Sequence, residues 1–318
     1  MKLIDVTLRD GGFVNDFNWD ISFAKNHYKK VSDMKLHYCE LGYWKQSAKS
    51  SNRFYSLNED DVIEIVDGVD GADIAVMIDY HYCSKNFNDY PKALTNPVKL
   101  IRLTARREDI NEAAKFAAEL KDATNLKVAF QIINSTNYSR DELIKTVNGI
   151  KDMPLSMIYF ADSHGNMDLL QNWNIFEPSV EILKNAGIKV GFHLHNHTNR
   201  GLTNYMICKS NNIEYMDASI RGLGKGIGNL RLEDIIHNEV FPDMLEYMSN
   251  STVKEMKISK KEAFYKMTGR LNITDNYANV GIDLGLDFKN FWNSAKLLDG
   301  VDKDTYDKNK LIQIIESV

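Results

Sequence analysis

The sequence is poor in cysteine and proline, and it has no long hydrophobic run and no large excess of either charge. The three cysteines, Cys39, Cys83 and Cys208, lie far apart, so they form neither a disulfide framework nor a metal-binding pattern. The absence of any run of about 18 apolar residues argues against a membrane span. A net charge of −5, from 39 basic and 44 acidic side chains, argues against nucleic-acid binding, which usually requires a basic surface.

The composition is typical of a globular protein with a substantial core, since 43% of the residues are hydrophobic and 26% are charged. Near the N-terminus, Asp5, Arg9 and Asp10 interrupt what would have to be the apolar core of a signal peptide. We therefore expect a cytoplasmic protein. The length of 318 residues allows one large α/β domain or two ordinary ones.

The main pattern along the chain is an alternation of short β-rich runs with amphipathic stretches. The clearest helix is predicted over 108–124, where apolar residues recur at three-to-four spacing. Strand–helix units at roughly 30-residue spacing predict an α/β fold, the (β/α)₈ TIM barrel. A doubly wound sheet shares the alternation but usually has fewer units, and no early Gly-x-Gly-x-x-Gly turn is present. The eight predicted strands cover residues 3–8, 36–42, 74–79, 98–104, 126–133, 156–161, 188–195 and 215–219.

The β-rich runs stop near residue 240, and the remaining chain predicts helices over 260–271, 287–298 and 304–318. We expect a TIM-barrel catalytic domain over residues 1–240. A helical C-terminal extension over residues 241–318 would pack on this barrel, because no low-complexity linker separates the two parts. The apolar residues of 264–271 and 288–298 would either support a homodimer or cover the barrel.

Three polar clusters follow predicted strands, where the catalytic groups of a barrel lie. In the first, Asp10 is suited to hold a cation and Arg9 to face an anion. The alternative is that the two residues form a purely structural ion pair. In the second, His193 and His195 are two residues apart on a predicted strand. Because successive side chains alternate between the two faces of a strand, these two point the same way, as two ligands of a metal would. The third is the glycine-rich segment 221–229, which is either an anion-binding loop or a flexible connection.

Other polar residues lie in or at the ends of further predicted strands. Each one alone is more often a surface or packing residue. Together they place many ionisable groups at one rim, which a purely structural role does not predict. These residues are Glu40, Tyr80, His81, Arg102, Gln131, Asp162, Ser163 and His164.

Several of these segments together resemble the signature of the DRE-TIM metallolyases. They are DVTLRDGG (5–12), CELG (39–42) and HLHNH (193–197), supported by ADSHG (161–165) and MDASIRGLGKGIGNLRLED (216–234). This HMGL-like superfamily includes 3-hydroxy-3-methylglutaryl-CoA lyase, isopropylmalate and homocitrate synthases, and 4-hydroxy-2-oxovalerate aldolase. The resemblance covers about residues 1–234.

The resemblance implies a divalent metal ion held by Asp10, His193 and His195, with Asn229 as a further ligand. Mn²⁺ or Mg²⁺ is the expected ion, and Co²⁺ and Zn²⁺ are alternatives. The resemblance further implies that Arg9 stabilises an enolate. Glu40 matches the glutamate that completes the signature. No other cofactor is expected.

Within the superfamily, the chain is most similar to the oxovalerate aldolases, because its GLGKGIGN loop resembles theirs and lacks the cysteine of the CoA lyases. One position departs from that pattern, since Phe13 replaces the histidine that serves as acid–base in the aldolases. Another group must then move the proton. The candidates are His164, Asp16 and Tyr265, the last of which lies in the segment EAFYKM and loosely matches an aldolase tyrosine.

The expected function is metal-dependent aldol cleavage of a 4-hydroxy-2-oxo acid through a pyruvate-type enolate. One alternative is a Claisen-type condensation with an acyl-CoA, and another is a barrel without catalytic activity. A sugar-modifying aldolase is a third alternative, in which rim aromatics would stack on a sugar ring. The family's oxovalerate aldolases bind an aldehyde dehydrogenase, but no segment identifies a surface for such a partner. The rim aromatics are Tyr43, Trp44, Tyr80 and Tyr82.

Overall fold

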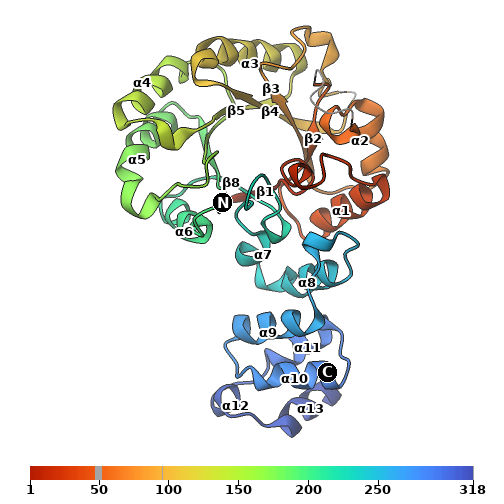
Figure 1. Cartoon of the computed structure of the whole chain (residues 1–318). Coiled ribbons are helices and arrows are strands. Elements are labelled where there is room, and N and C mark those ends of the chain that lie inside the picture. Colours follow the sequence, from red (N-terminus) through yellow and green to blue (C-terminus); the bar gives the residue numbers. More distant parts are fainter. Residues whose placement is uncertain (47–51, 95, 318) are drawn as a thin grey trace. The chain divides into compact units, whose positions relative to one another are not determined.

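The computed structural model describes residues 1–46, 52–94 and 96–317. Its first part is a closed barrel of parallel strands that pair in sequence order from β1 to β8, with helices around the outside (Figure 1). This confirms the predicted TIM barrel and all of its predicted strands. The strands are β1 (Lys2–Asp5), β2 (Tyr38–Tyr43), β3 (Asp73–Asp79), β4 (Val98–Ala105), β5 (Lys127–Ile132), β6 (Met157–Ala161), β7 (Lys189–His193) and β8 (Tyr215–Ala218).

Helices follow most of the strands. The local sequence fixes where helix α4 (Arg140–Ile150) begins, because Ser139 and Glu142 form a capping box in which each side chain accepts a hydrogen bond from the other's backbone N–H. The helices of the barrel are α1 (Ile21–Asp33), α2 (Glu59–Val66), α3 (Ile110–Thr124), α4 (Arg140–Ile150), α5 (Leu169–Asn185), α6 (Gly201–Ser210) and α7 (Leu232–Ile235). Short 3₁₀ turns also occur in the connections, at η1 (Gly11–Val14), η2 (Arg53–Tyr55), η3 (Phe87–Asp89), η4 (Arg107–Asp109), η5 (Ser135–Asn137) and η6 (Ile220–Gly222).

The connection between β3 and β4 differs from the predicted strand–helix unit. Its described residues contain only the 3₁₀ turn η3 and no α-helix. Pro91 and Pro97 lie in this connection, which is also rich in asparagine and aspartate. Such residues favour turns over a helix, and no apolar three-to-four period is present to stabilise one.

The barrel interior is apolar below the site. Side chains from the strands fill it, and Tyr159 is among the largest of them. A Cβ atom at Gly191, the register partner of Tyr159, would lie 2.4 Å from the tyrosine ring. Glycine at this position therefore makes room for Tyr159. The guanidinium of Arg102 lies 4.5 Å from the centre of the same ring, where the apolar interior gives way to charged groups.

The chain divides into two compact units, Met1–Asp234 and Ile235–Val318. The second unit is helical, as predicted, and its core includes Phe264, whose ring centroid lies 5.1 Å from that of Phe288 and 5.0 Å from that of Phe291. The domain boundary at residue 240 and the packing of the extension on the barrel stay predictions. The helices are α8 (Phe241–Ser249), α9 (Lys260–Leu271), α10 (Asn276–Asp283), α11 (Phe288–Ala295), α12 (Val301–Asp304) and α13 (Lys308–Ser317), with 3₁₀ turns η7 (Asn238–Val240) and η8 (Lys254–Met256).

In the part of the chain that the structure describes, no helix combines the length and the apolar character needed to span a membrane.

Candidate metal centre and active site

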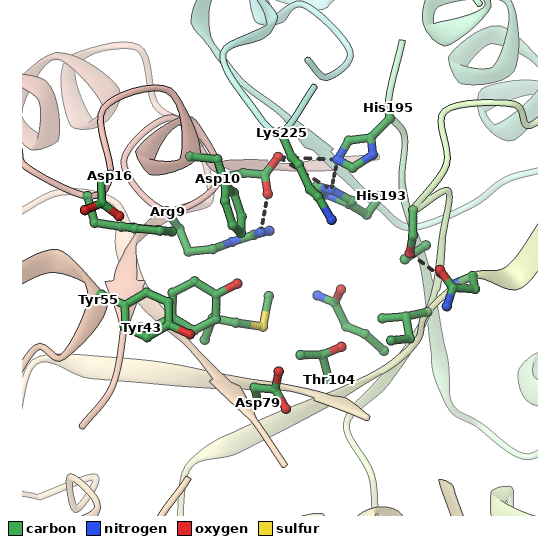
Figure 2. A pocket seen from close by; sticks show the side chains of 18 residues that line it. Arg9, Asp10, Asp16, Tyr43, Tyr55, Asp79, Thr104, His193, His195 and Lys225 are labelled. Carbon is green, nitrogen blue, oxygen red and sulfur yellow. Dashed lines mark hydrogen bonds and ion pairs between the residues drawn. The ribbon is translucent and has the colours of Figure 1, made fainter. Parts of the chain in front are cut away.

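Asp10, His193 and His195 meet at the carboxyl end of the barrel (Figure 2). One ligand atom from each lies within 4.8 Å of the other two, and all three residues are buried. Nε2 of His195 is 3.3 Å from Nε2 of His193 and 3.5 Å from Oδ2 of Asp10. One carboxylate and two imidazoles form a donor set suited to a divalent transition metal or Mg²⁺. The residues present therefore fit the metal ion that the sequence predicts.

The local backbone differs slightly from the prediction at these residues. β1 ends at Asp5 and β7 ends at His193, so Asp10 and His195 lie in the segments that follow the strands. His195 forms an isolated antiparallel bridge with Asn229. This bridge, rather than strand alternation, positions the second imidazole of the cluster.

Asp10 is held in its ionised form. Burial would raise its pKa, but Arg9 and the two histidines outweigh burial and hold the pKa well below its usual range. Nη1 of Arg9 donates to Oδ1 of Asp10 at 2.5 Å, and Nδ2 of Asn229 donates to Oδ2 at 2.7 Å. A carboxylate that stays ionised is available as a metal ligand over the whole physiological pH range.

His193 is oriented by Asp217, whose Oδ2 lies 2.8 Å from Nδ1 of the ring. Burial would raise the pKa of Asp217, but Arg102 and His193 outweigh burial and lower it, so this carboxylate is ionised and can only accept. Nδ1 of His193 must therefore be the donor, and Nε2 faces Asp10 and His195, where a neutral ring would present its lone pair. A second carboxylate behind a ligating histidine is a common feature of metal sites.

Asp217 is a residue of this site that the sequence analysis missed. It lies on β8 at the same parity as the inward-facing Tyr215, within an otherwise mostly apolar strand. A charged side chain at an inward position was the available signal. Arg102 was expected at the rim, but it is fully buried and joins two acids, donating to Oε2 of Glu40 at 3.0 Å and to Oδ2 of Asp217 at 2.5 Å.

The structure brings Arg9 and Glu40 together, as the resemblance implies. Nε of Arg9 donates to Oε2 of Glu40 at 2.7 Å. Burial would lower the pKa of Arg9, but Glu40 and Asp10 outweigh it and raise the pKa, so the guanidinium stays charged. Its third nitrogen, Nη2, is buried without a hydrogen-bond partner among the described residues. Such a donor is costly to bury and is available for a ligand oxygen.

Asn229 reaches the cluster through its amide nitrogen rather than its oxygen. Besides Asp10, Nδ2 donates to the carbonyl of Leu223 at 3.0 Å, whereas Oδ1 is buried without a partner in the described part of the chain. The predicted role of Asn229 as a metal ligand needs this orphaned oxygen to turn toward the cluster, and it stays a prediction. Gly224 permits the close packing here, because a Cβ there would lie 2.4 Å from Nδ2 of Asn229 and 2.6 Å from Oδ2 of Asp10.

A cavity of about 490 Å³ opens beside the cluster. Arg9, Asp10, His193 and His195 line one side, and Lys225 of the glycine-rich loop reaches into the cavity (Figure 2). The other residues that line the cavity are Phe13, Asp16, Phe17, Tyr43, Tyr55, Met77, Asp79, Thr104, Gln131, Ile133, Asn134, Ala161 and Ser163.

Of the three acid–base candidates, only Asp16 is among the described residues that line this cavity. The structure does not bring His164 there, because its exposed ring lies on the surface with Nε2 3.2 Å from Nδ2 of Asn137. Tyr265 belongs to the second unit, where its hydroxyl lies 3.4 Å from Oδ1 of Asn279. Its predicted role stays a prediction.

Only one of the four predicted rim aromatics is among the described residues that line the cavity. Tyr43 lines the cavity, whereas Trp44 is buried elsewhere, with its indole N–H donating to the carbonyl of Asp89. Tyr80 and Tyr82 are not among the described residues around the cavity. Tyr55, which lies in η2, lines the cavity instead. The sequence analysis did not identify Tyr55, Asp79 or Thr104 as candidate site residues.

A second group of potential ligands, Asp5, His27 and Cys39, is fully buried between β1, β2 and α1. Asp5 accepts hydrogen bonds from the Thr7 hydroxyl at 2.7 Å and pairs with Nε2 of His27 at 2.7 Å. Burial raises the pKa of Cys39 well above its usual value, so the thiol stays protonated. This group is a satisfied packing cluster away from the cavity.

The fold and the cluster define a TIM-barrel protein with a candidate metal site at the carboxyl end of its strands. The chain belongs to the HMGL-like family, whose model matches residues 1–257. This confirms the family predicted from the sequence.

The relatives that the chain matches carry several activities in their names. The 4-hydroxy-2-oxovalerate aldolase of Geobacillus thermodenitrificans is 22% identical over 238 residues, which cover 74% of this chain and 68% of the relative. The 2-isopropylmalate synthase of Streptococcus gallolyticus is 23% identical over 291 residues, covering 88% of this chain and 55% of the relative. The protein is thus similar to an aldolase and to a synthase at comparably low identity.

Solved structures of HMG-CoA lyases share the fold. The enzyme of Bacillus subtilis aligns with a TM-score of 0.58 at 17% identity, covering 82% of this chain and 90% of the other. The enzyme of Pseudomonas aeruginosa aligns with a TM-score of 0.60 at 16% identity, covering 89% and 97% of the two chains.

Proposed function

We propose that the protein is a divalent-metal-dependent aldolase that cleaves, or in reverse forms, the C3–C4 bond of a 4-hydroxy-2-oxo acid. The observation that carries this proposal is the buried cluster of Asp10, His193 and His195 beside the unpartnered Nη2 of Arg9, at one side of a large cavity. The relatives named 4-hydroxy-2-oxovalerate aldolase support the same chemistry.

Asp10, His193 and His195 would hold the metal ion, with Mn²⁺ or Mg²⁺ expected and Co²⁺ or Zn²⁺ as alternatives. The bound cation would polarise the carbonyl oxygen of the 2-oxo acid as a Lewis acid. Asp217 orients the ring of His193, and Arg9 keeps Asp10 ionised, because each pairs with that residue.

In the cleavage direction, a proton leaves the C4 hydroxyl, the C3–C4 bond breaks, and an aldehyde departs. The electron pair of that bond remains on the three-carbon fragment as the enolate of pyruvate, which then takes a proton at C3. Arg9 donates from Nη2 to the oxygen that becomes negative, and Glu40 holds the guanidinium in place. Lys225 offers a positive charge to the substrate carboxylate. We assign the acceptance of the hydroxyl proton to Asp16, because its side chain lines the cavity.

The proposal is tested by exchange of the methyl protons of pyruvate into D₂O, followed by NMR. The protein is first treated with a chelator and then given Mn²⁺, Mg²⁺, Co²⁺ or Zn²⁺. Exchange that depends on metal and is lost in Asp10→Asn is expected, since enolate formation requires no aldehyde. A protein that binds metal without exchanging pyruvate would point to an acyl-CoA donor, which thiol release from acetyl-CoA would reveal. Failure to bind any of these ions would overturn the proposal.

Two further expectations concern the location and the assembly of the protein rather than the site. A cytoplasmic location and a homodimer both stay predictions, and no surface in the described part of the chain identifies an aldehyde dehydrogenase partner.

A further inference from the structure

We infer that the cavity wall formed by Tyr55, Asp79 and Thr104 is a subsite for substrate hydroxyl groups. The aldehyde half of the substrate is then a short polyhydroxylated chain rather than an alkyl chain. This inference rests on the proposed aldolase function and adds the class of its substrate. We call these three residues the hydroxyl wall.

The hydroxyl wall lies across the cavity from the metal cluster. Asp79 ends β3 and is the register partner of Thr104 on β4, and both side chains line the cavity. Figure 2 shows them on the side opposite Asp10, His193 and His195. A substrate that places its 2-oxo acid at the cluster therefore extends its other end toward these residues.

Asp79 can accept further hydrogen bonds from a ligand. Its Oδ1 accepts from the backbone N–H of His81 at 2.9 Å. No lysine or arginine forms an ion pair with it in residues 1–46, 52–94 and 96–317. The carboxylate is half-buried at the cavity surface, so Oδ2 can accept a charge-assisted hydrogen bond from a ligand hydroxyl.

Tyr55 and Thr104 supply the complementary donors. Burial raises the pKa of Tyr55, and the nearby Asp79 carboxylate raises it further, so the phenol keeps its proton and can donate. The Thr104 hydroxyl both donates and accepts. Each carbon of a polyol carries a hydroxyl group, which both donates and accepts a hydrogen bond. The two donors Tyr55 and Thr104 and the strong acceptor Asp79 therefore match the hydroxyl groups on neighbouring carbons. An alkyl chain would leave Oδ2 of Asp79 and the hydroxyls of Tyr55 and Thr104 without a ligand partner, which costs binding energy.

The cavity has the size and lining for such a chain. Its volume of about 490 Å³ lies within the range of sites for drug-sized ligands and leaves room for a chain longer than pyruvate. The ring of Tyr43 lies 5.0 Å from that of Tyr55, so an aromatic surface adjoins the polar groups. Aromatic faces beside hydrogen-bonding groups suit the C–H and O–H groups of a carbohydrate-like chain.

The test compares two substrates of equal carbon length in the Mn²⁺-loaded protein. Cleavage of 4,5,6-trihydroxy-2-oxohexanoate gives pyruvate and glyceraldehyde, and cleavage of 4-hydroxy-2-oxohexanoate gives pyruvate and propanal. Both reactions are redox-neutral, and pyruvate release is followed with lactate dehydrogenase. We expect kcat/KM to favour the trihydroxy acid on the order of 10- to 100-fold, as for one or two hydrogen bonds to a charged group.

Two variants assign this preference to the hydroxyl wall. Asp79→Asn keeps an oxygen for the His81 N–H but removes the charge, and it should reduce the preference to about threefold or less. Thr104→Val, which keeps the side-chain shape, should reduce it by a smaller factor. The matched control is Asp122→Asn on the exposed face of α3, which lies outside the cavity and should keep the full preference.

The outcomes distinguish failure of the hydroxyl wall from failure of the proposed aldolase function. Equal kcat/KM for both acids, or a preference for 4-hydroxy-2-oxohexanoate, would overturn the hydroxyl wall and leave the aldolase function standing. An undiminished preference in Asp79→Asn would also overturn it. If neither acid is cleaved and pyruvate exchanges no protons, the aldolase function itself fails, and the hydroxyl wall fails with it.

Discussion

Nδ1 of His193 donates a hydrogen bond to Oδ2 of Asp217 across 2.8 Å, in the buried interior between β7 and β8. Because the carboxylate is ionised and can only accept, this bond fixes the imidazole tautomer. Nε2 of His193 faces Asp10 and His195, and in the neutral ring it is the nitrogen that can ligate a metal ion. Asp217, which is not among the described residues that line the cavity, thus orients the ring of His193.

The first prediction is that Asp217→Asn weakens Mn²⁺ binding by about 10- to 100-fold, the usual effect of losing a carboxylate behind a ligating histidine. An asparagine can place either its oxygen or its NH₂ group against Nδ1, so the tautomer is no longer fixed. Isothermal titration with Mn²⁺ measures the affinity, with Asp122→Asn as the surface control. Equal affinity in Asp217→Asn and the wild type would refute this role for Asp217.

Acid stability gives a second prediction for the same residue. The folded-state pKa of Asp217 is lowered, so its contribution to stability is fully present above the unfolded pKa of about 4 and is lost as the pH falls through the folded value. Asp217→Asn should therefore reduce the free energy of unfolding by about 3 kcal/mol at pH 6, since it breaks a buried ion pair. At pH 3 the reduction should be smaller, because the wild type has already lost part of the interaction. Urea denaturation at both pH values measures the difference, and an equal cost at both would contradict this account.

Much of the barrel was predictable because strand and helix periods are local properties of the sequence. The helix predicted over 108–124 appears as α3 (Ile110–Thr124), and its apolar residues are buried as their spacing requires. The connection between β3 and β4 was not predictable from the repeating unit, because proline and asparagine there override the expected helix.

The site was predictable where a short sequence motif determines which side chains lie close together. His193 and His195 meet Asp10 as expected, although a bridge to Asn229 replaces the predicted strand at His195. Asp217 left a weak signal, as a charge at an inward strand position. Tyr55 left none, because it comes from η2 in the connection after β2, and nothing in the sequence shows that this turn folds over the barrel mouth.

Gly224 gives the third prediction. Its missing side chain lets the loop after β8 lie against Asp10 and Asn229, since a Cβ there would meet both at under 3 Å. Gly224→Ala should therefore displace one of these groups and weaken Mn²⁺ binding by at least about tenfold, the scale of a disturbed ligand shell. Gly269→Ala is the matched control, because that helical glycine has open space around it. If both variants bind Mn²⁺ like the wild type, the packing at Gly224 does not support the metal centre.

The fourth prediction concerns His164, which the sequence proposed as the acid–base group. Its exposed ring pairs with Asn137 and is not among the described residues of the cavity. His164→Asn should therefore leave the rate of aldol cleavage within about twofold of the wild type, as surface changes usually do. Asp16→Asn, in contrast, should lower aldol cleavage by about 10²-fold or more, the usual contribution of a general base. A large loss of cleavage in His164→Asn would return the proton transfer to that histidine.

Arg9 gives the last prediction, because its charge and its shape can be separated. The guanidinium uses Nε for Glu40 and Nη1 for Asp10, which leaves Nη2 for the substrate oxygen. A lysine keeps the positive charge but lacks the planar fork that reaches all three partners. Arg9→Lys should therefore lower the rate of pyruvate proton exchange about 10²- to 10³-fold, the effect of removing one donor to a developing oxyanion. Mn²⁺ affinity should change far less, and Arg107→Lys on the barrel exterior should change neither quantity. Equal losses of exchange and of Mn²⁺ affinity in Arg9→Lys would mean that Arg9 acts through Asp10 alone.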